Sequence, residues 1–491
     1  MFTVINKTTI RTWGIYQNLQ WVFILLFIAK LSFVPGNQDN AIDPWTENPQ
    51  YWQYKGEPVL LLGGSDHDNL FNHPDTGPDG LEAHLDVLAS NNGNYVRNTM
   101  SSRDENNPWP YEKNENNLYD LSKWNEEYWQ RFDNFLQMTS ERDIIVQIEF
   151  WDGHDIQNRN GGDAAIERWN AHPLNPKNNI NYTADETSLP DLWDRGYLEE
   201  THPALRTIPA ENNDQIVLMY QRHFINEVMN RTLKYDHVLY TIQNESWASK
   251  EWSNYWASFA REKAAERSKR IYISDMRFAP SVTPVLEYGF DFAEFSQSAS
   301  GAERPANSHI SQGHFYSIAE ELAKLIDKQV PVNSVKQYGS DEIAWTVSSE
   351  EGVERVWRTI FAGQASVRFH RPPHGLGLST RAQANIRSLR MVTDLIDIFN
   401  VLPHQEVDHL LSDRNDNEAY LMADPARAYA VFFTSLGREV TLNISGLESN
   451  ARLRWLNPNT GEWLQEKMVE GDFVTLTKPD EGQWVVTITN N

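Results

Sequence analysis

Residues 238–247 read Val238-Leu-Tyr-Thr-Ile-Gln-Asn-Glu-Ser-Trp247, a short apolar run that ends abruptly in an amide, a carboxylate and an aromatic ring. This pattern is typical of a buried parallel strand with polar groups at its carboxyl end. Seven similar runs occur elsewhere and alternate with amphipathic segments, so the sequence predicts eight βα units, an α/β fold of the (β/α)8 TIM-barrel type. The predicted strands are 59–62, 95–97, 144–148, 238–242, 271–273, 290–293, 330–335 and 365–369, and the predicted helices are 81–89, 126–139, 214–233, 252–267, 318–326, 353–362 and 385–399.

The pattern changes after about Pro403. Short runs with alternating apolar and polar residues follow one another, and turn sequences such as Asn457-Pro-Asn-Thr-Gly461 separate them. Proline fixes one turn dihedral and glycine permits a positive one, so these runs predict a small antiparallel β-sandwich. The predicted domains are an N-terminal signal or anchor (1–38), a catalytic barrel (41–402) and a C-terminal β-sandwich (403–491).

Residues 1–38 have the features of an export signal. Lys7 and Arg11 precede the apolar run 21–29, which is short for a transmembrane helix and has the length of a signal-peptide core. No Ala-x-Ala cleavage site follows, so an uncleaved anchor is the alternative. We predict a secreted, periplasmic or cell-surface protein, and the absence of cysteine from 491 residues is more typical of a bacterial exported protein.

Composition excludes several functions. A net charge of −25 opposes binding to nucleic acid, and the lack of cysteine excludes a thiol nucleophile and a Cys-ligated zinc. No Gly-x-Ser-x-Gly elbow, glycine-rich phosphate loop or regular metal-ligand spacing occurs. We therefore expect no cofactor, no metal and no protein partner. The 18 tryptophans suit the stacking of sugar rings, and equally a large core.

Polar side chains follow each predicted strand, and in this fold the carboxyl ends of the strands form the active site. The residues at these ends include acids, cations and aromatic rings, as a hydrolase of a polar polymer requires. The predicted substrate-binding residues are Asn244, Arg97, Trp151, Asp152, His154, Lys336, Tyr338, Arg368, His370 and Arg371. The polar insertion 153–211 after the third strand is either a loop over this site or a tolerated surface excursion.

The pair Asn244-Glu245 at the end of the fourth strand resembles the hallmark of the retaining (β/α)8 glycoside hydrolases of clan A. The resemblance implies that Glu245 is the acid/base, that Asn244 binds the sugar 2-hydroxyl and that Arg97 braces the nucleophile. A helix cap is the alternative role for the pair. The stretches 428–433, 440–446, 454–461 and 482–486 are similar to the collagen-binding-like β-domain that a bacterial group of these barrels carries.

The sequence departs from the clan at the end of the seventh strand. The clan's nucleophile is a glutamate there, but Val335-Lys-Gln-Tyr-Gly-Ser340 places Gln337 where that glutamate is expected. A carboxamide is no anionic nucleophile, and glycoside cleavage needs a second carboxylate. It could come from Glu342 or Asp341, or from the third strand, on Glu149 or Asp152. An inverting or inactive protein is a further alternative.

The sequence therefore predicts a secreted glycoside hydrolase that cleaves O-glycosidic bonds in a polysaccharide or its oligosaccharides. Cations at the strand ends favour an anionic substrate, uronic or sulfated as in algal glycans, although they could instead pair with the catalytic acids. A non-catalytic carbohydrate-binding protein and a polysaccharide lyase are the alternative functions. The cations in question are Arg97, Arg103, Arg277, Lys336, Arg368 and Arg371.

Overall fold

The structure is a computed structural model. It describes residues 40–72, 78–104, 106–277, 282–296, 311–325, 327–343, 346–448 and 450–490. The predicted export segment 1–38 lies outside the described residues. Across the ranges given above, no helix is both long and apolar enough to span a bilayer.

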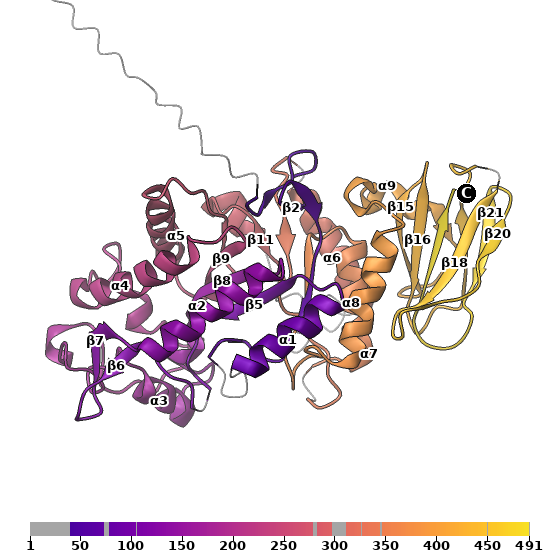
Figure 1. Ribbon diagram of the computed structural model, residues 1–491. Coiled ribbons are helices and arrows are strands. Elements are labelled where there is room, and N and C mark those ends of the chain that lie inside the picture. The colour runs from indigo at the N-terminus through magenta and orange to yellow at the C-terminus, as the bar shows by residue number, and fades with distance from the viewer. Residues whose placement is uncertain are drawn as a thin grey trace, which may run out of the picture.

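A ring of parallel strands forms the centre of the larger domain (Figure 1). Six strands lie in one sheet in the order β10-β9-β8-β5-β4-β13, and β11 pairs with β12. Hydrogen bonds from Asp291 N to Ile273 O (2.9 Å) and from Ala365 N to Val332 O (2.9 Å) join this pair to both edges of the sheet and close the ring. The predicted barrel is confirmed. Its strands are β4 (Leu61–Gly64), β5 (Tyr95–Thr99), β8 (Ile145–Asp152), β9 (Val238–Asn244), β10 (Ile273–Ser274), β11 (Ala293–Glu294), β12 (Val332–Asn333) and β13 (Ser366–Phe369).

Helices surround the ring, and side-chain caps set where several of them begin. The hydroxyl of Ser379 accepts a hydrogen bond from Ala382 N, so the helix predicted at 385–399 begins five residues earlier. It ends at Thr393, and only a short 3-10 turn, Ile398–Asn400, follows. The helices of the barrel are α1 (Pro78–Ser90), α2 (Glu126–Glu141), α3 (Gly162–Ala171), α4 (Gln215–Thr232), α5 (Lys250–Ala265), α6 (Ser311–Lys324), α7 (Ser349–Phe361) and α8 (Thr380–Thr393).

Two small sheets flank the barrel and were not predicted. The first predicted strand, 59–62, is divided between two of the observed elements: Val59 ends β3, whereas the barrel strand β4 begins at Leu61. The N-terminal sheet contains β1 (Asp43–Pro44), β2 (Trp52–Tyr54) and β3 (Glu57–Val59), and a hairpin after β5 contains β6 (Tyr111–Lys113) and β7 (Tyr119–Trp124).

The C-terminal module is antiparallel, as predicted. One sheet has the order β14-β17-β21, and the other has the order β15-β16-β22-β18-β19, with β20 paired to β18. Their facing apolar side chains form a core separate from that of the barrel. The module begins with the short helix α9 (His404–Val407), and its strands are β14 (Leu411–Ser412), β15 (Ala419–Asp424), β16 (Ala428–Phe433), β17 (Glu439–Asn443), β18 (Ala451–Asn457), β19 (Glu462–Trp463), β20 (Lys467–Val469), β21 (Phe473–Thr477) and β22 (Trp484–Thr489).

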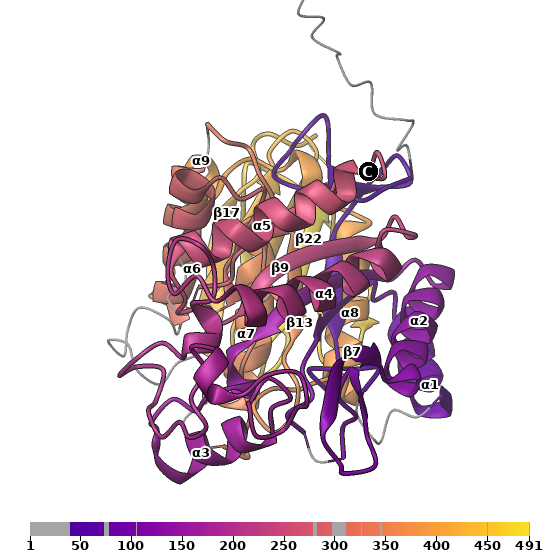
Figure 2. The same ribbon diagram turned by 90° about the vertical axis from the view of Figure 1, so that its left-hand side faces the viewer.

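The module packs against α7 and α8 of the barrel, and in Figure 2 it lies behind the barrel. The ring of Trp357 on α7 is fully buried and stacks on Phe432 of β16, with ring centroids 5.3 Å apart and an interplanar angle of 9°. Ser435 N donates to the carboxylate of Glu354 at 3.0 Å. The two domains therefore share an apolar and hydrogen-bonded contact, and the module covers the outside of the barrel rather than the ends of its strands.

Candidate active site

Glu245 directly follows β9, at the carboxyl end of the ring. Its backbone φ is +51°, in the left-handed region that residues other than glycine rarely adopt. Such a conformation costs of the order of 1–3 kcal/mol and persists where the surroundings impose it. The side chain is 14% exposed, so the carboxylate is sheltered yet reachable from solvent.

Lysine, tyrosine and histidine side chains contact this carboxylate. Lys336 Nζ donates to Glu245 Oε1 at 2.6 Å and to Asn244 Oδ1 at 2.6 Å. The Tyr338 hydroxyl lies 3.4 Å from the same Oε1, and His154 Nε2 lies 3.3 Å from Oε2. The Lys336 side chain is only 2% exposed, which strengthens its interaction with the carboxylate.

These contacts decide the charge of Glu245. Burial favours the neutral acid, but Lys336 and His154 outweigh it and hold the pKa of Glu245 well below its ordinary value. Glu245 is therefore a carboxylate in the free protein. A group that donates a proton must first acquire one, so proton donation by Glu245 requires that Lys336 moves away or is neutralised.

Lys336, and not Gln337, faces Glu245, one residue before the position at which the sequence predicts the clan's nucleophile. The amide of Gln337 donates to Ser334 Oγ (2.7 Å) and Thr359 Oγ1 (3.0 Å), on the side away from Lys336. Successive side chains along an extended segment point to opposite faces, which explains the difference of one residue. A cation, and not an amide, therefore lies against the carboxylate of Glu245.

Arg97 is hydrogen-bonded or ion-paired to three residues near Glu245. The guanidinium is fully buried and donates two 2.7 Å hydrogen bonds to the carboxylate of Glu149. It also donates to Asn244 Oδ1 at 2.9 Å and forms an ion pair with Asp68. This planar, bidentate geometry is specific to arginine, and it fixes Asn244 next to Glu245.

Asp68, which follows β4, is a site residue that the sequence interpretation did not single out. Arg371 Nε donates to its Oδ2 at 2.6 Å and Arg103 to the same oxygen at 2.8 Å, in addition to the ion pair with Arg97. Burial opposes its ionisation, but the charges of Arg97, Arg371, His370 and Arg103 outweigh burial and hold the pKa of Asp68 well below its ordinary value. Asp68 and Arg371 line a cavity of about 420 Å³.

An aromatic wall stands beside Glu245. The rings of Trp247 and Tyr197 stack with centroids 3.9 Å apart, and His154 meets Trp247 edge-on at 5.7 Å. A Cβ on Gly153 would lie 2.4 Å from the Trp247 ring, so glycine is required there for this packing. Tyr197 and His154 belong to the insertion 153–211, so this insertion reaches the site. No sequence motif had singled out Tyr197.

Of the remaining predicted site residues, some contact the residues around Glu245 and others are packed in the protein interior. Asp152 accepts from Asn244 Nδ2 at 3.1 Å and pairs with Arg103, and His370 packs on Tyr338 with ring centroids 4.6 Å apart. Trp151 packs among the rings of α4 and α5, and fully buried Arg368 donates to Val335 O at 2.7 Å.

Asp341 and Glu342, the two acids predicted after the seventh strand, lie on the exposed surface. Asp341 accepts a hydrogen bond from Ser349 N at 3.0 Å, at the start of α7. The structure thus groups Asp341 with the helix and not with Arg97 and Asp68. Among the residues that the structure describes, no three His, Asp or Glu side chains form a group that could hold a metal ion.

The C-terminal module matches a known family. Residues 402–489 match the family model described as "Putative collagen-binding domain of a collagenase". This match confirms the likeness predicted for the C-terminal stretches. A comparison with curated protein sequences finds no match.

Several solved structures that resemble this chain are named as glycoside hydrolases. One, named "Glycoside hydrolase", aligns with a TM-score of 0.63 at 11% identity, over 92% of this chain and 97% of its own. A family 5 glycoside hydrolase from Bacteroides vulgatus aligns with a TM-score of 0.62 at 12% identity, over 92% and 94%. A family 5 mannosidase from Rhizomucor miehei, in complex with mannosyl-fructose, gives 0.51 at 14% identity, over 74% and 99%. At these identities the likeness establishes the fold, and the activity is a separate question.

Proposed function

We propose that this protein is a glycoside hydrolase in which Glu245 is the catalytic acid/base. The observation that carries the proposal is the strained, partly exposed Glu245 at the end of β9, beside Asn244 and the ring of Trp247. Strained backbone at the carboxyl end of a barrel strand is typical of a catalytic position. The fold shared with solved glycoside hydrolases supports the same reaction class.

The substrate of this hydrolase is a glycan with an anionic group. Lys336 holds Glu245 as a carboxylate in the free protein, and a carboxylate or sulfate of the substrate is the natural competitor for that ammonium. When the substrate anion takes Lys336, the pKa of Glu245 rises and the carboxylate can accept a proton. Glu245 then protonates the leaving oxygen as the glycosidic C–O bond breaks, and the water that adds to the anomeric carbon returns a proton to Glu245.

Asp68 is the second carboxylate of the proposed mechanism. Its three arginine partners hold its pKa well below the ordinary value, so it is a carboxylate at neutral pH, and it lines the cavity of about 420 Å³ at the strand ends. A permanent negative charge there stabilises the positive charge that develops on the sugar ring. Glu149, in contrast, is fully buried and bonded to Arg97, and Asp341 and Glu342 are exposed, so we assign this role to none of the three.

Reducing-sugar release from a glycan panel tests the proposal. We expect the protein to cleave polygalacturonate, alginate or a sulfated galactan, and to prefer acidic over matched neutral oligosaccharides by about 10- to 100-fold in kcat/KM, since a charge-assisted hydrogen bond contributes about 1.5–3 kcal/mol. Cleavage of xylan and mannan alone would contradict the anionic substrate. A product that absorbs in the ultraviolet would identify a lyase instead.

Substitution of Lys336 by methionine tests the link between substrate charge and Glu245. Without the ammonium, the pKa of Glu245 rises in the free protein, because the charge of Lys336 is the largest of the effects that lower it. Activity that requires protonated Glu245 falls as pH rises through this pKa, so we expect the alkaline limb of kcat/KM to move to higher pH in Lys336→Met. The preference for acidic substrates should fall about tenfold or more.

The matched control is Lys250→Met, which removes an exposed lysine at the start of α5. We expect its pH profile and substrate preference to equal those of the wild type. An alkaline limb that stays in place in Lys336→Met, or that moves to lower pH, would show that Lys336 does not govern Glu245.

A non-catalytic carbohydrate-binding protein is the second candidate function. The specific observation in its favour is that Lys336, and not a carboxylate, faces Glu245 across the ring. Binding of acidic oligosaccharides without release of any product across the panel would establish this function. Export to the cell surface or the medium, proposed on residues 1–38, is tested separately by fractionation of cells that express the full chain.

A further inference from the structure

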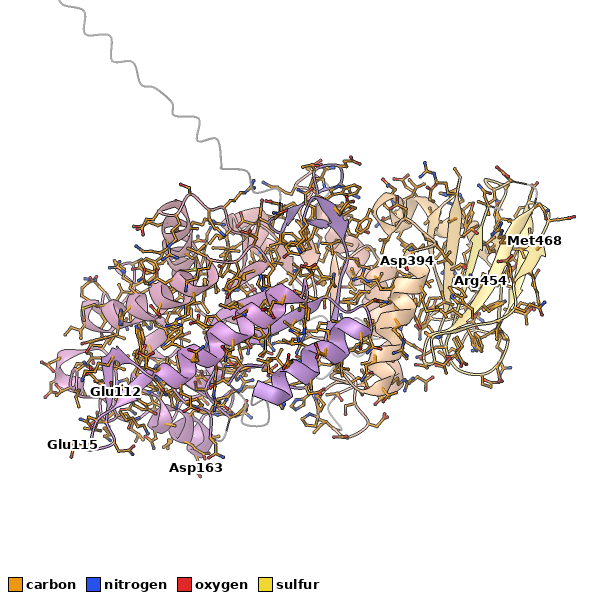
Figure 3. The ribbon with its side chains drawn as sticks, in the orientation of Figure 1. Glu112, Glu115, Asp163, Asp394, Arg454 and Met468 are labelled. Atoms are coloured by element: carbon orange, nitrogen blue, oxygen red, sulfur yellow. The ribbon has the colours of Figure 1, made fainter. Side chains whose placement is uncertain are left out.

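A second cleft opens outside the site described above. Its volume is about 460 Å³, and it lies between the hairpin β6–β7 and the loop that precedes the hairpin. Aromatic rings make up much of its lining, from Trp109, Tyr111, Tyr119 and Trp124. In Figure 3 the hairpin residues Glu112 and Glu115 lie at the same end of the molecule as Asp163 of α3, far from Met468 of the C-terminal module.

Asn107 contributes the side chain that marks this cleft as a binding site. It lines the cleft, is only 8% exposed, and within the described ranges neither its amide nitrogen nor its amide oxygen has a hydrogen-bond partner. An unpartnered buried amide costs about 1–3 kcal/mol per polar group, so such a residue calls for an explanation. An amide offers two donors and an acceptor in one plane, which suits a ligand that carries neighbouring donors and acceptors.

The walls of the cleft are held in place before any ligand arrives. Asn125 Nδ2 donates to Trp109 O at 3.0 Å, and Asn125 N donates to Pro110 O at 2.9 Å. The ring of Trp124 stacks on His223 of α4, with centroids 4.2 Å apart and an interplanar angle of 13°. The partly exposed Trp109 and Trp124 therefore lose little conformational freedom when a ligand binds, which favours affinity.

We propose that this cleft is a second, non-catalytic binding site for a neutral sugar ring of a glycan chain. The C–H face of a pyranose packs on the partly exposed ring of Trp109, and two neighbouring hydroxyls of the sugar satisfy the amide of Asn107. Glu112 and Glu126 at the lining outnumber Lys113, so the cleft favours an uncharged ring over an anionic one. It would hold a neutral part of the chain whose anionic part meets Lys336. The inference concerns binding alone and does not require that Glu245 be catalytic.

Isothermal titration with mannohexaose, cellohexaose and xylohexaose tests the proposal. The full chain carries Glu245→Gln throughout, so that no probe is consumed. We expect one of these neutral hexasaccharides to bind, and Trp109→Ala or Asn107→Leu to weaken this binding about tenfold or more. Trp463→Ala, which removes a half-buried tryptophan of the C-terminal module, is the matched control and should leave binding unchanged.

Thermal unfolding separates a binding role of Asn107 from a structural one. Leucine is close to asparagine in size and removes the unpartnered amide, so Asn107→Leu should unfold at the same or a higher temperature while it loses affinity. The proposal would be overturned if both cleft variants bound the sugar as tightly as the chain with an intact cleft. It would also be overturned if none of the three probes bound. Tighter binding of an uncharged hexapeptide than of the sugars would overturn the sugar assignment. The reducing-sugar assay on the wild-type chain decides the catalytic proposal independently.

Discussion

Replacement of Glu245 by glutamine is expected to lower kcat on the natural glycan by about 100- to 10,000-fold, with little change in KM. A positioned general acid contributes a factor of this size, and an amide of the same shape cannot donate the required proton. Lys336 would keep Asn244 as a hydrogen-bond partner, so the variant is expected to fold. Initial rates over a range of substrate concentrations give kcat and KM separately.

The choice of leaving group distinguishes an acid from a merely structural residue. A 2,4-dinitrophenyl glycoside has a leaving group that needs no proton, so Glu245→Gln should be much less impaired on it than on the natural glycan. Glu251→Gln, on the exposed first turn of α5, is the matched control and should retain full activity on both substrates. Equal losses of Glu245→Gln on both substrates would mean that the residue does not act by proton donation.

Replacement of Arg97 by methionine is expected to lower the free energy of unfolding by about 3–5 kcal/mol. Arg97 is fully buried and supplies two hydrogen bonds to the carboxylate of Glu149, which has no exposed surface. Removal of one partner of a buried ion pair leaves an uncompensated charge, and this penalty has the stated size. Denaturant unfolding followed by fluorescence measures it, and lysine at position 97 should restore only part of it because lysine lacks the bidentate fork.

The pH dependence of this loss has a defined sign. Asp68 has a pKa well below its ordinary value, so its pairing stabilises the fold above the unfolded pKa of about 3.9 and loses this effect as pH falls. The difference between wild type and Arg97→Met should therefore be largest near neutral pH and narrow below about pH 4. Arg131→Met, which breaks the exposed pair with Glu127, should change stability by no more than about 1 kcal/mol at any pH. A loss that does not vary with pH would point to packing alone.

The barrel could be predicted because its strands are buried on both faces. Every residue of β9 is buried, so its apolar run stands out from the polar segments around it. The hairpin β6–β7 could not be predicted in the same way. Tyr119 and Leu121 are buried by a segment about 60 positions further along the chain: Tyr119 N donates to Asn178 O and Leu121 N to Asn181 Oδ1, each at 2.7 Å. The residues of the hairpin alone do not indicate that such a distant segment covers them.

The site residues that lie at the ends of barrel strands could be predicted from the sequence. Glu245, Asn244 and Arg97 could be predicted from their places at the end of β9 and in β5, and the structure brings them together. The partner of Glu245 could not be chosen between Lys336 and Gln337, because β12 is only two residues long and the side that each residue faces depends on tertiary contacts. Asp68 could not be singled out from the sequence, because its environment is formed by three arginines from other parts of the chain.

The Lys336–Glu245 contact also has an evolutionary consequence. Lysine and glutamate codons differ by a single nucleotide, and position 336 lies across the ring from a glutamate that already has an asparagine before it and an arginine beneath it. One base change would therefore replace the cation by the opposing carboxylate of a two-carboxylate glycosidase, with the rest of the scaffold untouched.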